Sequence, residues 1–168
     1  MLHTYTVSFF GHRIIENLME AEERLSKLLR ELIRQKEYLE FLVGRDGDFD
    51  LLAGEEIRKA ARNYGCGNTH LTLIMPYMRA EFRDNEREYL NYYDAVEICA
   101  ESAAAHFKSA IQLRNRSMVD RSDLIVCYIS QEQGGAYSTV KYAEAQDIPV
   151  VYLADEYRFN TALDQLKR

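Results

Sequence analysis

Proline, cysteine and flexible spacer segments are scarce in this sequence. Only two of its 168 residues are proline, and no stretch rich in glycine, serine or proline divides the chain. We therefore expect a single domain over residues 1–168. The three cysteines, Cys66, Cys99 and Cys127, lie far apart and show neither CxxC nor zinc spacing. This pattern predicts reduced thiols and no metal centre.

Positive charge and long apolar runs are also limited. The chain has 21 Lys and Arg against 27 Asp and Glu, a net charge of −6. A surface that coats a duplex needs the opposite sign, so we do not expect nucleic acid as a partner unless a local basic patch supplies the contact. No apolar run reaches the ~20 residues of a membrane helix. The chain also begins without a secretory signal, which together with the thiols predicts a cytoplasmic protein that does not contact membranes.

What the sequence does contain is enough apolar surface for a core, because 47% of its residues are hydrophobic and 29% are charged. This balance excludes a disordered chain. Short apolar runs predict strands at residues 5–10, 38–43, 71–75, 95–99, 124–129 and 150–153. Amphipathic runs predict helices over 18–32, 53–64, 79–93, 103–121, 135–146 and 158–167. The alternation predicts an α/β fold with a doubly wound, mainly parallel sheet and helices on both faces.

Polar residues follow three of the predicted strands. They are Gly11-His12-Arg13 after the first strand, the carboxylate-rich turn at 44–50 after the second, and residues 133–139 after the fifth. In a doubly wound sheet, ligands bind beyond the carboxyl ends of the strands, where the strand order reverses. We therefore expect the turns at Gly11 and Gly134 to face one another in a single cleft.

The turn at Gly134 is the best candidate for an anion site. Paired glycines let the backbone approach a phosphate, and the free amides of the following helix favour negative charge. Ser138 and Thr139 add hydroxyl donors. The plainer interpretation is a loop that only turns the chain into a helix. Neither the GxGxxG pattern nor the GxxxxGK[ST] pattern is present, so the sequence indicates neither a standard dinucleotide site nor a P-loop.

Three arginines, Arg114, Arg116 and Arg121, lie close together in the helix predicted over 103–121. Arg114 and Arg121 are seven residues apart and share a helix face, whereas Arg116 points elsewhere. A guanidinium group forks well onto phosphate, so Arg114 is predicted to be a second phosphate clamp. A solvated helix face is the alternative.

Alternating carboxylates at Asp46, Asp48 and Asp50 look like the start of a calcium loop. Leu51 stands where such a loop needs glycine, and Ile57 stands where it needs glutamate. We therefore expect no EF-hand and no metal site here.

Taken together, five segments resemble the SLOG superfamily, which joins the SMF/DprA DNA-processing proteins with the Lonely Guy (LOG) cytokinin-activating enzymes. The resemblance extends over about residues 5–153, and is greatest to the small bacterial YpsA-like "TGHR"-type family. The segments are Gly11-His12-Arg13, Gly44 with Asp50 to Glu55, Met75-Pro76-Tyr77, Arg114-Asn115 with Met118 and Ser122-Asp123, and Gly134 to Thr139.

This resemblance implies a Rossmann-like domain that binds a nucleotide or a nucleotide-derived ligand, such as an ADP-ribose-like molecule, as a sensor without a required cofactor. Gly11, His12 and Arg13 would line the ribose or base end. Asp50 matches the acidic residue that opens the second helix in the family. The phosphate end would be formed by Arg114, Asn115, Gly134, Gly135, Ala136, Tyr137, Ser138 and Thr139.

The sequence departs from the family at three informative positions. Phe10 stands where threonine is usual, and Tyr137 replaces the third glycine of the LOG pattern. Lys141 occupies the position of the LOG glutamate, a cation where an oxocarbenium-like state needs negative charge. We therefore predict binding without turnover. An N-glycosidic hydrolase with Asp50 as its carboxylate is the alternative, and single-stranded DNA binding is a third. The sequence leaves the ligand and any homo-oligomer open.

Overall fold

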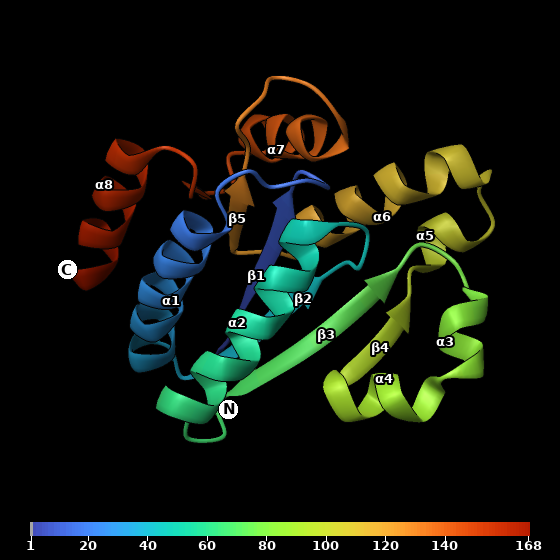
Figure 1. Cartoon of the computed structure of the whole chain (residues 1–168), viewed down its shortest axis with the longest axis horizontal. Coiled ribbons are helices and arrows are strands. Elements are labelled where there is room, and N and C mark those ends of the chain that lie inside the picture. Colours follow the sequence, from blue (N-terminus) through green and yellow to red (C-terminus); the bar gives the residue numbers. More distant parts are fainter. Residues whose placement is uncertain (1) are drawn as a thin grey trace.

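A six-stranded parallel sheet runs through the computed structural model, which describes residues 2–168 (Figure 1). Its strand order is β4-β3-β2-β1-β5-β6, and each neighbouring pair is parallel. The strands are β1 (Thr4–Gly11), β2 (Tyr38–Val43), β3 (Thr69–Met75), β4 (Ala95–Ile98), β5 (Leu124–Tyr128) and β6 (Val150–Tyr152). The predicted α/β fold class is therefore confirmed, with a sheet that is parallel throughout.

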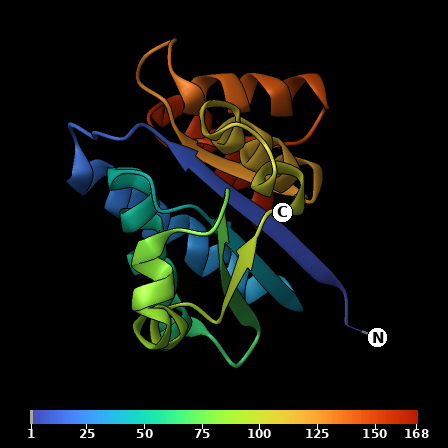
Figure 2. The same ribbon diagram turned by 90° about the vertical axis from the view of Figure 1, so that its right-hand side faces the viewer.

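Helices cover both faces of this sheet (Figures 1 and 2). The larger apolar core lies under α1, α2, α3, α4 and α8, and the smaller one under α6 and α7. The helices are α1 (Leu18–Gln35), α2 (Asp48–Tyr64), α3 (Ala80–Asp84), α4 (Glu86–Tyr92), α5 (Ala100–Ala103), α6 (Phe107–Asp120), α7 (Gly135–Ala145) and α8 (Glu156–Lys167). In the described part of the chain, no helix has the length and apolar character needed to cross a bilayer.

Alternation along β1 shows how the sequence builds the two cores. Val7 and Phe9 point into the larger core, and Phe10 points into the smaller one. Each fully buried large apolar side chain of this kind contributes about 1.5–3 kcal/mol to folding. The middle of β1 is therefore buried on both faces, between the two layers of helices.

Two helical regions differ from the prediction. Residues 79–93 form two short helices, α3 and α4, because the side chain of Asn85 donates to the carbonyl of Glu81 and competes with the helical hydrogen bonds. The helix predicted over 103–121 begins only at Phe107, where the side chain of His106 accepts from the Lys108 amide and caps α6.

The strand order reverses at β1. From β1 the chain crosses to β2, β3 and β4 on one side, and β5 lies on the other side (Figure 1), followed by β6 at the edge of the sheet. The carboxyl ends of β1 and β5 therefore form the crevice in which open α/β sheets bind ligands.

Candidate functional site

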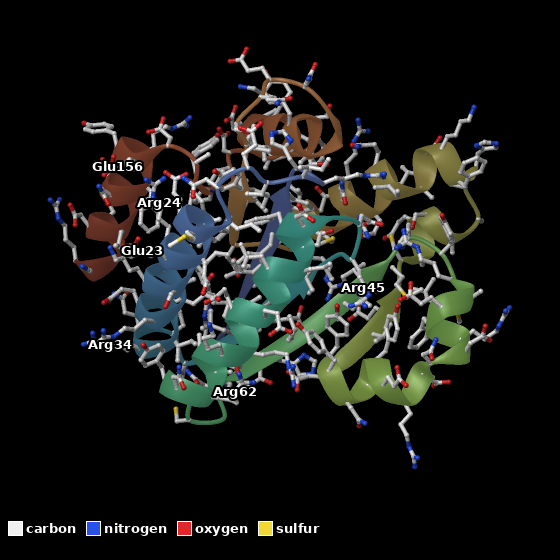
Figure 3. The ribbon with its side chains drawn as sticks, in the orientation of Figure 1. Glu23, Arg24, Arg34, Arg45, Arg62 and Glu156 are labelled. Atoms are coloured by element: carbon white, nitrogen blue, oxygen red, sulfur yellow. The ribbon has the colours of Figure 1, made fainter. Side chains whose placement is uncertain are left out.

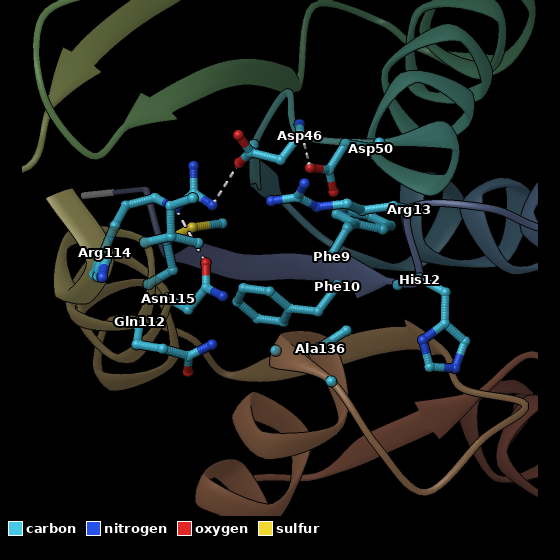
Figure 4. Close-up of a pocket in the computed structure, with 18 residues that line it drawn as sticks. Phe9, Phe10, His12, Arg13, Asp46, Asp50, Gln112, Arg114, Asn115 and Ala136 are labelled. Carbon is cyan, nitrogen blue, oxygen red and sulfur yellow. Dashed lines mark hydrogen bonds and ion pairs between the residues drawn. The ribbon is translucent and has the colours of Figure 1, made fainter.

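A pocket of about 410 Å³ opens at the carboxyl ends of β1 and β5 (Figure 4). Both Gly11, at the end of β1, and Gly134, after β5, line it. The predicted meeting of these two turns in one cleft is therefore confirmed. The volume is within the range of about 300–1,000 Å³ that is usual for small-molecule sites.

One wall of the pocket is the N-terminus of α7. Gly134 precedes the helix with φ of 95°, a left-handed conformation that glycine adopts without strain, and no side chain of residues 2–168 caps the helix. The first amide with an intrahelical partner is that of Ser138, which donates to the Gly134 carbonyl. A Cβ atom on Gly135 would lie 2.8 Å from Nε2 of Gln112. The α7 amides before Ser138 therefore have no partner within the helix, and the anion site that the glycine pair predicts stays a prediction.

Arg114 lies in the pocket wall but is 3% exposed. Its guanidinium group donates to Oδ1 of Asn115 at 3.0 Å, to the Ile74 carbonyl at 3.0 Å and to Oδ2 of Asp46 at 2.7 Å. These internal partners occupy donors that the spacing argument assigned to a phosphate. The expectation of an open phosphate clamp at Arg114 therefore does not match the geometry, because α6 directs this side chain inward.

Asp46 joins three elements at the floor of the pocket. Its second oxygen, Oδ1, accepts from Nη2 of Arg79 at 2.7 Å, so one carboxylate bridges two arginines (Figure 4 shows the bond to Arg114). Burial alone would raise the pKa of Asp46, but the guanidinium groups of Arg114 and Arg79 lower it below its ordinary value. Sequence reasoning missed this cluster, because no local spacing links residues 33 and 68 positions apart.

Asp50 is a second carboxylate of the pocket, on the first turn of α2. Its Oδ2 atom accepts from the backbone N–H of Asp46 at 2.9 Å. Burial raises the pKa of Asp50 to about 6, although that hydrogen bond and the charge of Arg114 favour the ionised form. A carboxylate with a raised pKa in a cleft is a typical feature of functional sites. It does not cap α2, whose N-cap is Gly47.

The exposed cations at this pocket are Arg13 and Lys108. Neither forms an ion pair with any residue in the described range 2–168. Arg13 was expected at the site, whereas Lys108 and Gln112 were not. The spacing of Lys108, Gln112 and Asn115 on α6 puts all three on one helix face, and this signal could have found them.

His12 is bonded within the protein at the edge of the pocket. Its Nε2 atom accepts from the backbone N–H groups of Ser130 at 3.1 Å and Gln131 at 3.2 Å. Burial lowers the pKa of His12 below its ordinary value.

Three residues of the predicted phosphate loop, Tyr137, Ser138 and Thr139, lie outside the pocket lining. The Thr139 hydroxyl donates to the Gly135 carbonyl and accepts from the Asn115 amide, so it supports the wall from behind. Lys141 is exposed and pairs with Glu144 at 3.2 Å. Its Nζ lies 5.4 Å from the centroid of the Tyr137 ring. No cluster of three or more potential metal ligands occurs in the described part of the chain.

Comparison with solved structures shows which proteins share this fold. DNA processing protein A (DprA) from Helicobacter pylori, described as binding single-stranded DNA, matches with a TM-score of 0.62 and 16% identity over 88% of this chain and 64% of that one. DprA from Streptococcus pneumoniae matches with a TM-score of 0.66 and 11% identity, over 96% and 56%. The molybdenum cofactor carrier protein from Chlamydomonas reinhardtii matches with a TM-score of 0.55 and 18% identity, over 97% and 86%.

These matches define the chain as an α/β domain with the Rossmann-like fold of DprA. The chain spans less than two thirds of the length of either DprA protein. No protein-family model matches the sequence, and a search of curated proteins gives no significant match.

Proposed function

We propose that this domain binds a small phosphorylated ligand, a nucleotide or nucleotide-derived molecule, as a sensor that does not turn it over. We further propose that it belongs to the SLOG superfamily, which the fold shared with DprA supports. One observation carries the binding proposal. In the described part of the chain, the uncapped N-terminus of α7 shares a pocket with two cations that form no ion pair, Lys108 and Arg13. This assigns Arg13 to the phosphate, whereas the family resemblance implies the ribose or base end. Free amides and cations together favour a phosphate.

The other groups of the pocket suit the rest of a nucleotide. Asp50 offers a carboxylate acceptor and Gln112 a primary amide, which can bond hydroxyl groups or a base edge. Phe10, Ile111 and Met118 supply apolar surface between them. A mostly apolar cavity with a few convergent polar groups is the usual form of a small-molecule site.

Two features of α7 support binding without turnover. Lys141, at the position of the LOG glutamate, is exposed and paired with Glu144. Glu144 also accepts from the Tyr152 hydroxyl, and neither residue lines the pocket. Helix α7 therefore supplies no carboxylate to stabilise an oxocarbenium-like state.

The N-glycosidic hydrolase is the second candidate, because Asp50 has a pKa of about 6 in the pocket. A general acid or base works best when its pKa is near the operating pH. The test is incubation with AMP, other nucleoside monophosphates and ADP-ribose, followed by chromatography for released base. We expect none. Base release that disappears in Asp50→Asn would make the protein a hydrolase.

Single-stranded nucleic acid stays among the ligands to be tested. The net charge of −6 does not decide the matter, because a local patch can bind DNA, and the H. pylori DprA protein that shares this fold is described as binding it. A single-stranded oligonucleotide therefore belongs in the same binding assay as the nucleotides.

The binding proposal is tested by calorimetry with AMP, ADP-ribose and adenosine on the wild type, Arg13→Ala and Lys108→Ala. Removing one charge-assisted hydrogen bond costs about 1.5–3 kcal/mol, so each variant is expected to bind AMP about ten- to a hundredfold more weakly. Affinity for adenosine should change little. Arg62→Ala is the matched control, because Arg62 is exposed near the far end of α2 (Figure 3). Equal losses for AMP and adenosine, or an equal loss in the control, would refute the phosphate site.

A further inference from the structure

The side chain of His12 links the pocket to residues 130–131, a segment far away in the sequence. It leaves the carboxyl end of β1, and its Nε2 atom accepts from the amides of Ser130 and Gln131, which follow β5. Within residues 2–168, no other hydrogen bond joins the backbone of residues 130–133 to the rest of the protein. The segment is exposed and leads directly to Gly134.

The chemistry of this contact requires a neutral imidazole. Both partners are backbone N–H donors, so Nε2 must carry the lone pair and Nδ1 must carry the proton. An imidazolium has no acceptor and would face two donors.

We propose that His12 is a positioning residue of the phosphate site: its neutral imidazole holds the segment at Ser130 and Gln131, and so presents Gly134 and the N-terminus of α7 to the ligand. Protonation of His12 releases the segment. This inference rests on the proposed function, and it gives His12 a different role from the ligand contact that the family resemblance implies.

We call the contact of His12 with the Ser130 and Gln131 amides the His12 clamp. Burial supports this clamp, because it lowers the pKa of His12 and so keeps the imidazole neutral. The clamp therefore stabilises the folded protein in full above the pKa of a free histidine, about 6.5. This stabilisation is lost as the pH falls through the lower pKa that His12 has in the folded state. Charged and titratable groups beside the clamp or across the pocket are Arg13 next to His12, Asp46 and Asp50 after β2, Lys108 on α6 and Glu132 in the clamped segment.

The ligand-free protein gives the first test. Nitrogen NMR of the histidine rings should show His12 as the Nδ1–H tautomer, with a pKa below that of a free histidine. Hydrogen exchange of the Ser130 and Gln131 amides should be faster in His12→Ala than in the wild type. His12→Gln should restore protection, because Oε1 of glutamine can accept in place of Nε2. An Nε2–H tautomer, or equal exchange in all three proteins, would overturn the clamp.

Binding of AMP and ADP-ribose gives the second test. Because His12→Ala loses both hydrogen bonds to the segment, we expect it to bind about tenfold more weakly or worse, and we expect His12→Gln to retain most of the affinity. Lowering the pH to one unit below the measured His12 pKa should weaken the wild type more than His12→Gln. The phosphate of the ligand titrates in the same way with both proteins, so its effect on affinity cancels in this comparison. His70→Gln is the control, since His70 contacts Thr72 away from the pocket.

The outcomes separate the clamp from the proposed function. If the wild type binds neither AMP nor ADP-ribose, the proposed function fails for these ligands, and the NMR and exchange data still decide the clamp. If the wild type binds and His12→Ala binds equally well, the clamp does not position the site. If acid strengthens wild-type binding relative to His12→Gln, the imidazolium contacts the phosphate and the proposal is overturned.

Discussion

Replacing Asp50 by asparagine should make the folded protein more stable at neutral pH. Burial raises the pKa of Asp50 to about 6, so the folded state resists its ionisation. At a pH between about 3.9, the pKa of a free aspartate, and about 6, the folded state therefore binds more protons than the unfolded state. The stability contribution of Asp50 is therefore present below the lower value and is lost as the pH rises through 6.

The expected size follows from the shift of about two pKa units. Each unit corresponds to 1.36 kcal/mol, so the ionised carboxylate destabilises the folded protein by about 2–3 kcal/mol at pH 7.5 and by about 1 kcal/mol at pH 4.5. Asparagine keeps an oxygen that can accept from the Asp46 amide. We therefore expect Asp50→Asn to raise the Tm by about 5–10 °C at pH 7.5, and by less at pH 4.5.

The assay is thermal unfolding of both proteins across that pH range, with urea unfolding at the two ends. Asp84→Asn is the matched control, because the Asp84 side chain is 66% exposed on α3. Its Tm should differ little from that of the wild type at either pH. Asp50→Asn would refute the reasoning if it were less stable than the wild type at pH 7.5, or if its advantage did not shrink on acidification.

Two other substitutions test the walls of the pocket. Gly135→Leu should abolish affinity for AMP, because the leucine side chain would fill the space before the α7 amides. The Tm should change little, since a Cβ there would meet only the amide end of Gln112. Calorimetry and thermal unfolding check the two expectations. Arg114→Ala should lower the free energy of unfolding by about 3 kcal/mol, because it removes the buried ion pair with Asp46; urea unfolding measures it. If the Arg114→Ala protein were as stable as the wild type but bound AMP more weakly and adenosine equally well, Arg114 would be a phosphate clamp after all.

Most of the fold could be predicted from the sequence because its signals are local. The strands at Tyr38–Val43 and Leu124–Tyr128 are short apolar runs, and the stripe of leucines in α1 has a period near 3.6. The break at Asn85 could not be predicted in this way, because polar residues on either side fit one helix as well as two. One side-chain hydrogen bond decided the outcome.

The candidate site was predicted less completely, because its charges interact over long sequence separations. The glycines at 11 and 134 mark their turns directly. By contrast, the role of Arg114 depends on Asp46, 68 positions away, and on the carbonyl of Ile74. Spacing along a helix indicates which residues share a face, but it does not tell whether a cation on that face has already met a carboxylate inside the protein.

The number of free cations sets what this pocket can bind. Arg114 and Arg79 both pair with Asp46, so Arg13 and Lys108 are the cations without an ion pair among the described lining residues. Two cations and one helix N-terminus suit a compact phosphate better than a polyanion. If a single-stranded oligonucleotide binds through this pocket alone, the logarithm of its affinity should fall against the logarithm of salt with a slope of about −1.4, from about 0.7 per neutralised phosphate. A slope several times steeper, unchanged in Arg13→Ala, would show that contacts outside the pocket dominate and that the domain binds nucleic acid on another surface.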